Sequence, residues 1–283
     1  MFELKIENSR GEMFELTHNP YYYVIGIDGL AYPSTTINTS TGGTVDGTFF
    51  NSSRVDMRNL VIRIVINGDI EANRQQLYRV FNLKKPCTVY FRNKNRDVKI
   101  EGYVETLECD LFSMREQAQV SILCPRPFFE DMNVIEEEMS NVLGGFEFPF
   151  SIGVGNPIPI SEIVDYPLAV VNNRGDAEAG FIMQVEFSNY VSGFKISNVT
   201  TQQYMQFTYM FNDGDEVTID TRPGKMKCEL LRAGEATNLL PWLTTTSTWL
   251  KLDYGDNEFT YTVDSHEDAV KVRFYATPLY GGV

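Results

Sequence analysis

The sequence predicts a mainly β protein of two domains. The first should carry the chain's single α-helix, and the second should be a β-sandwich or jelly roll. Three observations predict this class. Short apolar and β-branched runs alternate with polar residues and turn signals along most of the chain. One segment, residues 69–81, has helical spacing instead. At 283 residues, the chain is long enough for two cores of ordinary size.

The chain opens with strands. Residues 2–6 and 13–16 alternate apolar and polar side chains on either side of a Ser9-Arg10-Gly11 turn, which predicts a hairpin. The aromatic and β-branched run 21–27 predicts a further strand, and Asp28-Gly29 is a turn signal that ends it.

Residues 31–53 differ from their surroundings. They are rich in threonine and serine around a Gly42-Gly43 pair, and they contain few large apolar residues. We predict a long polar hairpin with Gly42-Gly43 at its tip. Because it has too little apolar surface to build a core, the hairpin should either be mobile or lie against a neighbour.

The segment from residue 60 to residue 130 organises the first domain. Leu60–Ile66 predicts a strand buried on most of both sides, interrupted by Arg63. Asp69 should cap the helix that follows. The apolar positions of this helix are Ile70, Leu77, Tyr78 and Phe81, and Lys84-Lys85-Pro86 stops it.

Three more strands follow the helix, at residues 88–91, 98–109 and 118–124. The apolar phase of the second slips, so we predict a bulge or strong twist near Gly102 and a sheet that curls round the helix. Pro125 and Pro127 forbid continued pairing. A domain boundary should therefore lie just beyond Phe129, dividing the chain into residues 1–133 and 134–283.

The second domain has about ten short apolar runs and no convincing helix, which predicts a sandwich or jelly roll. The expected strands are 146–150, 168–171, 181–187, 194–199, 204–211, 216–220, 226–231, 248–252, 259–263 and 270–275.

Charge and cysteine usage limit the function classes. Residues 132–283 hold 21 acidic and 9 basic side chains, within a formal net charge of −14. Nucleic-acid readers need a basic face, so we expect no specific DNA or RNA binding, and solubility is the simplest reason for the acidity. The N-terminus lacks an export signal, and no apolar run approaches the ~20 residues of a membrane span. We therefore expect a soluble protein that does not insert into membranes.

The four cysteines have no paired spacing and should be free thiols, mostly buried. They are Cys87, Cys109, Cys124 and Cys228.

The sequence contains no motif for catalysis, for a cofactor or for a metal. A phosphate loop, a nucleophile elbow and a paired-histidine zinc motif are all missing. His18 and His266 are best interpreted as solvated or locally bonded side chains. Residues 212–216 are rich in Asp and could offer carboxylates to Ca²⁺, but a hairpin turn explains them more simply. An enzyme is therefore not predicted, although paired carboxylates of a glycan hydrolase would leave no signature in one sequence.

A glycan contact is a separate hypothesis for the second domain. Aromatic side chains can stack on sugar rings, and Trp242 and Tyr254 fall in loops where they could do so. The alternative is that such residues belong to the core, which is our interpretation of Trp249.

Several segments, in order, resemble the distal tail protein family of long-tailed phages that infect Gram-positive bacteria. The segments that carry this resemblance are Gly26-Ile27-Asp28-Gly29, Arg54, the strand 60–68, the helix ending in Phe81, the strand 96–104 with Gly102, Ser121-Ile122-Leu123-Cys124-Pro125-Arg126-Pro127-Phe128-Phe129, Val217-Thr218-Ile219-Asp220-Thr221-Arg222-Pro223-Gly224, and Leu279-Tyr280-Gly281-Gly282-Val283.

The resemblance implies an N-terminal β-sandwich with one helix and a protruding belt hairpin, about residues 31–57. Six copies would close into a ring at the tip of the tail. The second domain would be an outward-facing β-sandwich like a galectin or a carbohydrate-binding module. The implied belt contacts are Ile37, Gly42, Gly43, Val45, Phe49, Phe50 and Arg54.

On this resemblance the protein is a structural virion component, made in the bacterial host cytoplasm, without a cofactor. Its implied partners are the tail tube protein, the tail-associated lysin or fibre protein and receptor-binding proteins. DNA would pass through the ring without being bound specifically. A lectin-like adhesion module that acts through the second domain is the alternative.

Overall fold

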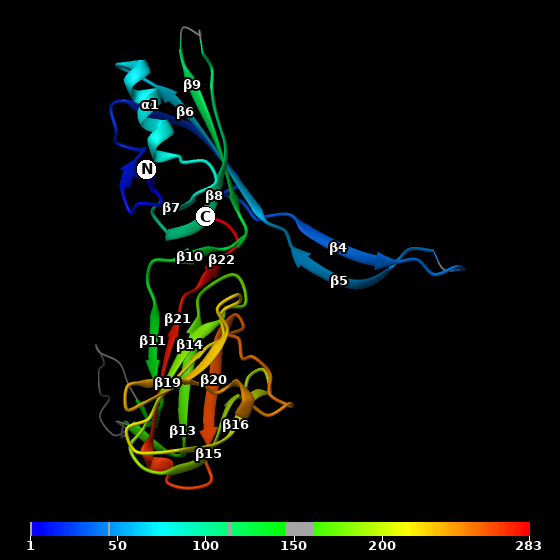
Figure 1. The fold of residues 1–283 in the computed structure, drawn as a ribbon. Helices are drawn as coiled ribbons and strands as arrows, with labels where there is room; N and C mark the ends of the chain where they lie inside the picture. The colour runs from blue at the N-terminus through cyan, green and yellow to red at the C-terminus, as the bar shows by residue number, and fades with distance from the viewer. Residues whose placement is uncertain (1, 45, 112–114, 145–160) are drawn as a thin grey trace, which may run out of the picture. The chain divides into compact units, whose positions relative to one another are not determined.

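The computed structural model describes residues 2–44, 46–111, 115–144 and 161–283, which form two compact units (Figure 1). One unit comprises Met1–Met132 together with Leu279–Val283, and the other comprises Asn133–Pro278. Both are mainly β, as predicted. The expected second domain ran to residue 283, whereas the last five residues belong to the first unit. The reason is that β22 (Leu279–Tyr280) pairs with β10 (Phe129–Asp131).

The first unit is built on one antiparallel sheet of nine strands. Strand β10 pairs with both β8 and β22, off the main path. The main path runs β2 (Met13–Glu15), β1 (Glu3–Glu7), β7 (Pro86–Arg92), β8 (Asp97–Cys109), β9 (Gln117–Cys124), β6 (Arg58–Ile66) and β3 (Tyr22–Asp28).

Strand β8 turns the corner that folds this sheet into two layers. Its first half pairs with β7 as far as Tyr103, and its second half pairs with β9 from Tyr103 onwards. The register shifts between Val104 and Thr106, which confirms the predicted irregularity near Gly102. A Cβ on Gly102 would lie 2.6 Å from Cγ2 of Ile122, so glycine lets β8 and β9 approach this closely.

Helix α1 (Ile70–Val80) follows β6 and begins at the predicted cap, because Oδ1 of Asp69 accepts a hydrogen bond from the Ala72 amide at 3.2 Å. Leu77 and Val80 are buried in the core of the first unit, and Phe81 directly after the helix is buried as well. The prediction that Tyr78 shares this apolar face was wrong. Tyr78 is exposed, because the buried stripe passes through Leu77 and Val80.

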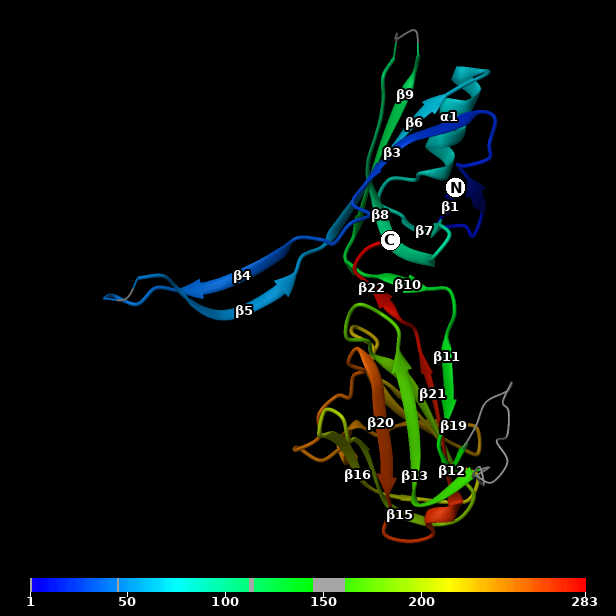
Figure 2. The same cartoon turned by 180° about the vertical axis from the view of Figure 1, so that it is seen from behind.

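Two strands of the first unit stay outside its large sheet. Among the strands of the described ranges, β4 (Thr35–Ser40) and β5 (Phe49–Val55) pair only with each other, and they form the extended ribbon seen in Figures 1 and 2. We call residues 31–57 the arm. The predicted long hairpin is therefore present.

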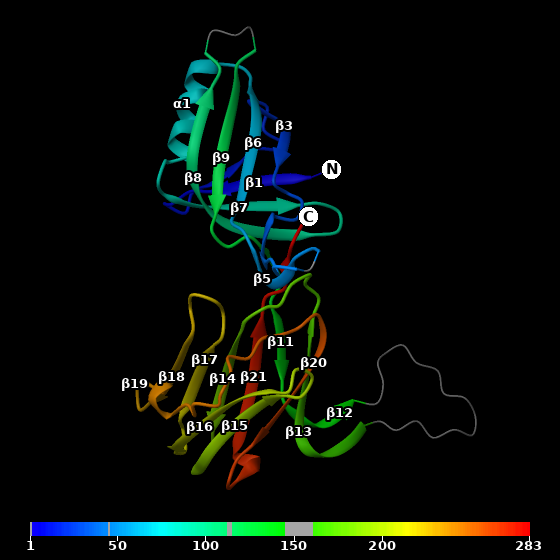
Figure 3. The same ribbon diagram turned by 90° about the vertical axis from the view of Figure 1, so that its right-hand side faces the viewer.

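The second unit is a sandwich of two antiparallel sheets (Figure 3). One sheet is ordered β11 (Ile135–Glu138), β21 (Val270–Ala276), β14 (Phe181–Phe187), β17 (Glu216–Asp220), β18 (Lys227–Arg232) and β19 (Glu235–Asn238). The other is ordered β12 (Ser140–Gly144), β13 (Ser161–Asn173), β20 (Gly255–Thr262), β15 (Val191–Asn198) and β16 (Gln203–Phe211).

Phenylalanines join the two sheets. Phe181 of β14 meets Phe259 of β20 edge to face, with ring centroids 5.4 Å apart. Phe187 of β14 stacks on Phe211 of β16 at 4.2 Å. Aromatic pairs of this kind contribute beyond the area they bury. The alternating aromatic residues that predicted these strands therefore form the core between the sheets.

Some expected elements of the second unit differ from the structure. Residues 248–252 are extended but not a strand, although Leu250 and Leu252 are fully buried and Leu252 forms a bridge to Ala179. Two short 3-10 turns are also present, η1 (Leu240–Trp242) and η2 (Glu267–Ala269). The expected strand 146–150 lies outside the described residues. Within the described ranges, no helix is long and apolar enough to cross a membrane.

Candidate assembly site

Polar cross-strand bonds hold the arm together. The Thr36 hydroxyl lies 2.9 Å from the Asp56 carboxylate, and the Asp56 amide donates to the Ser34 carbonyl at 2.9 Å. Further along, Nδ2 of Asn38 donates to the Ser52 hydroxyl at 3.0 Å. These bonds fix the register of β4 against β5, but they bury almost no apolar surface. A two-stranded hairpin of this kind is marginally stable by itself.

A bulge gives the arm one apolar face. Cross-strand partners share a face, and Thr35, Ile37 and Thr39 alternate onto one side of β4. Their partners are Val55, Ser53 and Phe50. Without the register shift between Asn38 and Thr39, Asn51 rather than Phe50 would oppose Thr39. The bulge therefore brings Phe50 onto the face that carries Ile37 and Val55, and we call these three residues the apolar stripe.

Nothing in the described part of the chain covers the stripe. Ile37 is 61% exposed and Phe50 is 67% exposed, and every residue of β5 is exposed. Apolar side chains gathered on an exposed hairpin with open edges are typical of an interaction surface.

The other predicted belt residues take different places. Phe49 lies on the opposite face, with its ring over Gly42, where a Cβ would be 3.1 Å from Cε2 of Phe49. Gly43 has open space around it. Arg54 also lies on the opposite face and reaches Asp56 at 3.8 Å, a solvent-exposed ion pair that contributes little. Val45 lies outside the described residues.

Arg58 anchors residues 29–32, where the chain enters the arm, and we call these residues the arm root. Arg58 was not predicted from the sequence. Its side chain is 2% exposed at the start of β6. The guanidinium donates to the carbonyls of Gly29 and of Ala31, the latter at 2.7 Å. Two more bonds of 2.6 Å reach the carbonyls of Pro127 and Gly281. Arg58 thus joins the arm root to two other segments of the first unit. An arginine two residues before the apolar run that starts at Leu60 was the sequence signal.

The proposed glycan contacts lie in the second unit. Trp242, in η1, is 36% exposed and meets Tyr209 edge to face at 5.0 Å. Tyr254 is 74% exposed at a bend before β20. An open groove of about 340 Å³ lies over β15 and β16, and its lining includes Tyr209, Lys195 and Asp264. Trp242 thus contacts a residue that lines this groove, and Tyr254 does not line it.

The acidic turn at residues 212–216 has a structural use. The Asp215 carboxylate is buried and accepts two hydrogen bonds from Arg232, at 2.6 and 2.8 Å, and one from the Asn212 amide. Burial raises the pKa of Asp215, but these bonds outweigh it, so the pKa is lowered. Among the described residues, no group of three or more His, Cys, Asp or Glu side chains is placed to hold a metal ion.

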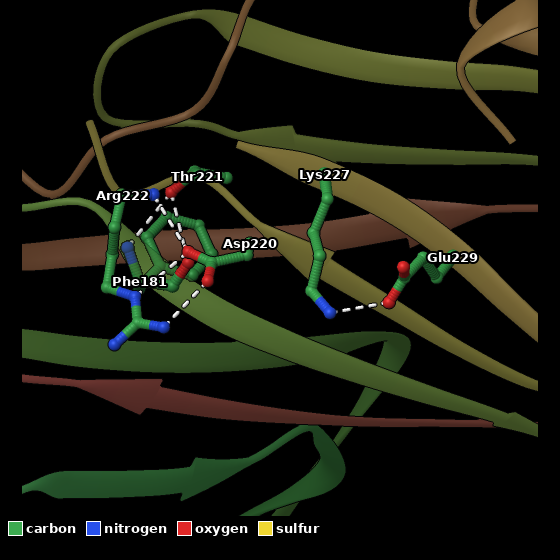
Figure 4. Close-up of polar contacts among 6 residues, drawn as sticks. All are labelled: Phe181, Asp220, Thr221, Arg222, Lys227 and Glu229. Atoms are coloured by element: carbon green, nitrogen blue, oxygen red, sulfur yellow. Dashed lines mark hydrogen bonds and ion pairs between the residues drawn. The ribbon is translucent and has the colours of Figure 1, made fainter. Parts of the chain in front are cut away.

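The segment from Val217 to Gly224, like the acidic turn, is held by hydrogen bonds to a buried carboxylate (Figure 4). Its buried Asp220 carboxylate accepts hydrogen bonds from the amide, Nε and Nη2 of Arg222, at 3.0, 2.9 and 2.6 Å. The Thr221 hydroxyl accepts from the Phe181 amide at 2.9 Å. Burial raises the pKa of Asp220, but the bonds from Arg222 lower it further than burial raises it. This segment therefore holds the end of β17 against the start of β14.

The histidines lie at the surface, and three of the four cysteines lie in the cores. His18 and His266 are both exposed. All four cysteines are free, as predicted. Three are buried, and burial raises their thiol pKa values to about 12, which keeps them protonated and unreactive at neutral pH. These three are Cys87, Cys124 and Cys228.

Two family models match the chain, each within a different unit. Residues 11–124 match the phage tail protein RIFT-related domain, and residues 174–277 match the C-terminal domain of the siphovirus-type tail component. The chain belongs to the Dit family of phage tail components. The resemblance inferred from the sequence is thereby confirmed. No curated protein matches this tail component.

Solved structures share the fold of this tail component over the whole chain. The crystal structure of SPP1 Dit (gp 19.1), described as a paradigm of the hub adsorption apparatus in phages that infect Gram-positive bacteria, has a TM-score of 0.69. Its identity is 14%, and 99% of each chain is covered. The phage P2 baseplate in its activated conformation with Ca contains a chain with a TM-score of 0.52 at 10% identity. The corresponding structure with Sr gives 0.51 at 9%, and both baseplate chains are covered completely, as is this one.

Proposed function

We propose that this tail component is a structural hub at the distal end of the phage tail, in which six copies close into a ring. The ring would join the tail tube to the tail-associated lysin or fibre protein and to receptor-binding proteins. The family assignment supports a structural role in the virion rather than an enzymatic one. The fold shared with SPP1 Dit and with baseplate chains supports the place in the tail.

The arm is the observation that carries the ring proposal. Its apolar stripe is exposed, and no other described strand pairs with the outer edge of β4 or of β5. A second copy can cover the stripe and complete the edges. A head-to-tail contact of this kind repeats from copy to copy, and it closes into a ring if the rotation between copies allows.

The acidity of the chain is compatible with a ring through which DNA passes without being bound. The net charge is −14, and like charge repels the phosphate backbone of DNA. We therefore propose that DNA passes through the ring without specific binding. Most of the acidic excess lies in residues 132–283, so repulsion by the first unit itself is modest.

The test of the ring is the mass and shape of the purified full chain, alone and with its tail-tube partner. We expect six-fold rings by negative-stain imaging and a hexameric mass by light scattering. The variant Ile37→Ser/Phe50→Ser removes two apolar side chains of the stripe and should abolish rings without changing the fold. Tyr190→Ser, at an exposed aromatic residue of the second unit, is the control and should assemble normally. A wild-type chain that stays monomeric with and without its partner contradicts the proposal.

A lectin-like role of the second unit is the alternative, and the groove over β15 and β16 favours it. Its lining combines the ring of Tyr209 with polar side chains, among them Lys195, Gln206 and Asp264. Glycans are held by this combination of ring stacking and polar contacts. A glycan array with the full chain, compared with Tyr209→Ala and Trp242→Ala, tests it. Binding that both variants leave unchanged excludes this groove, and no binding at all leaves the second unit as a docking platform.

A further inference from the structure

The segment Leu279–Val283, which we call the tail segment, approaches the arm along a fixed path. Its first two residues are strand β22, and Phe129 pairs with Tyr280 in the β10 ladder. The Tyr280 hydroxyl donates to Oδ2 of Asp131 at 2.8 Å. The Arg96 guanidinium lies 3.9 Å from the centre of the Tyr280 ring. The β10 ladder, the Tyr280 hydrogen bond and the Arg96 contact therefore fix the direction in which residues 281–283 continue.

Beyond β22, the tail segment bonds to the arm root at two points. The Gly281 carbonyl accepts from Nη2 of Arg58 at 2.6 Å, and the same guanidinium donates to Ala31 of the arm root. The Val283 amide donates to the Leu30 carbonyl at 3.1 Å. The tail segment and the arm root, about 250 positions apart in the chain, are thus joined directly by the Val283–Leu30 bond and indirectly through the buried Arg58 guanidinium.

Gly281 leaves room for the Tyr32 ring, and its backbone conformation does not call for glycine. Its φ is not in the left-handed region, so alanine would suit the backbone. A Cβ at this position would lie 2.1 Å from Cε1 of Tyr32, which is at the start of the arm. The Tyr32 ring therefore rests directly on the Gly281 backbone. The tail segment and the arm root occupy complementary shapes at this point.

From these contacts we propose that the arm root is a binding site for the tail segment, and that docking of this segment sets the direction in which the arm leaves the first unit. The arm forms no ladder with any other strand that the structure describes, so its direction is decided at its root. The root is held by Arg58, by Tyr32 against Gly281, and by the Leu30 carbonyl. Removing the tail segment should leave β4 paired with β5 but leave the pair without a fixed direction. The consequence for ring assembly rests on the proposed function.

Hydrogen exchange of the full chain, followed by mass spectrometry, tests this proposal. In Gly281→Ala, amides at the arm root should exchange roughly tenfold faster, because the displaced Tyr32 ring and the shifted Gly281 carbonyl loosen the root. Combining it with Tyr32→Ala should bring exchange back to the level of Tyr32→Ala alone, because the added methyl group then has room. A chain that ends at Tyr280 keeps β22 and should show the same acceleration as Gly281→Ala. Tryptophan fluorescence, which reports only the second unit, should stay unchanged in all variants.

The outcomes separate this proposal from the ring. If root exchange is the same in wild type, in Gly281→Ala and in the shortened chain, the tail segment does not position the arm and the proposal is overturned. If the root loosens as expected but the wild-type chain forms no rings, the tail segment still acts as proposed and the ring proposal fails. If wild type forms rings and the root loosens as expected, Gly281→Ala and the chain that ends at Tyr280 should also form fewer complete rings than wild type.

Discussion

Replacing Arg58 by methionine tests whether one buried charge holds the first unit together at the arm root. Methionine keeps an apolar stem of similar length but donates no hydrogen bond. The substitution removes donors from four carbonyls, those of Gly29, Ala31, Pro127 and Gly281. It also removes the guanidinium that lies 4.4 Å from the centre of the Phe129 ring.

The size of the effect follows from the burial of these groups. Each carbonyl left without a donor costs about 1 kcal/mol, so four cost roughly 4 kcal/mol. The wild type, however, bears the cost of burying a charge, and burial accordingly lowers the pKa of Arg58. Methionine avoids that cost, and we expect the first unit to lose about 3 kcal/mol of stability.

The two units can be measured separately. Both tryptophans, Trp242 and Trp249, belong to the second unit, so their fluorescence during urea unfolding reports that unit. Hydrogen exchange in β6 and β9 reports the first. We expect the most protected amides there to exchange roughly a hundredfold faster in Arg58→Met, with the fluorescence transition unchanged.

Arg63→Met is the matched control in the same strand. Arg63 is partly exposed and forms a 2.7 Å ion pair with Asp28 at the surface, so its loss should cost less than about 1 kcal/mol. Equal effects of the two substitutions would refute the assignment of Arg58 as the anchor. A loss below about 1 kcal/mol in Arg58→Met would do so as well.

Three further predictions concern separate parts of the chain. Asp220→Asn should destabilise the second unit by about 2 kcal/mol at neutral pH. Because the folded pKa of Asp220 is lowered from its ordinary value of 3.8, its contribution is complete above that value and is lost as pH falls below it, so an acid titration should bring wild type and variant together. In native protein at pH 8, iodoacetamide should label Cys109, which is only partly buried, well before the three buried thiols, and equal labelling of all four would contradict their burial. Gly102→Ala should cost the first unit about 2 kcal/mol by overpacking against Ile122, and an unchanged unfolding midpoint would show that β8 can shift to make room.

Local chemistry explains which parts of the fold were predictable. The cap at Asp69, the strand periods and the corner near Gly102 depend on neighbours within a few residues, so the sequence shows them directly. The arm was predictable for the opposite reason, because its polar composition contains too little apolar surface for a core. Tyr78 was misassigned because two neighbouring helical phases, one through Leu77 and one through Tyr78, fit the same spacing.

The candidate site was only partly predictable. The seven belt residues came from a resemblance. The structure places the six described ones in three groups: Ile37 and Phe50 on the apolar stripe, Phe49 and Arg54 on the opposite face, and Gly42 and Gly43 beyond the end of β4. The bulge that brings Phe50 beside Ile37 depends on the pairing of two strands, which a single run of residues does not reveal. In the same way, Trp242 and Tyr254 are both exposed, but only tertiary contacts show that one reaches the groove through Tyr209.

By itself, the sequence determined the mainly β class, the single helix, the free cysteines and a polar arm that cannot form a core, since each follows from composition or from periods of two and 3.6 residues. The tertiary structure alone decided what holds that arm. Arg58 gathers carbonyls from positions 27 to 223 residues away, and the tail segment returns to the first unit after the whole of the second has been traversed. A buried cation satisfied by backbone carbonyls leaves no complementary side chain in the sequence, because every residue type carries the same acceptor.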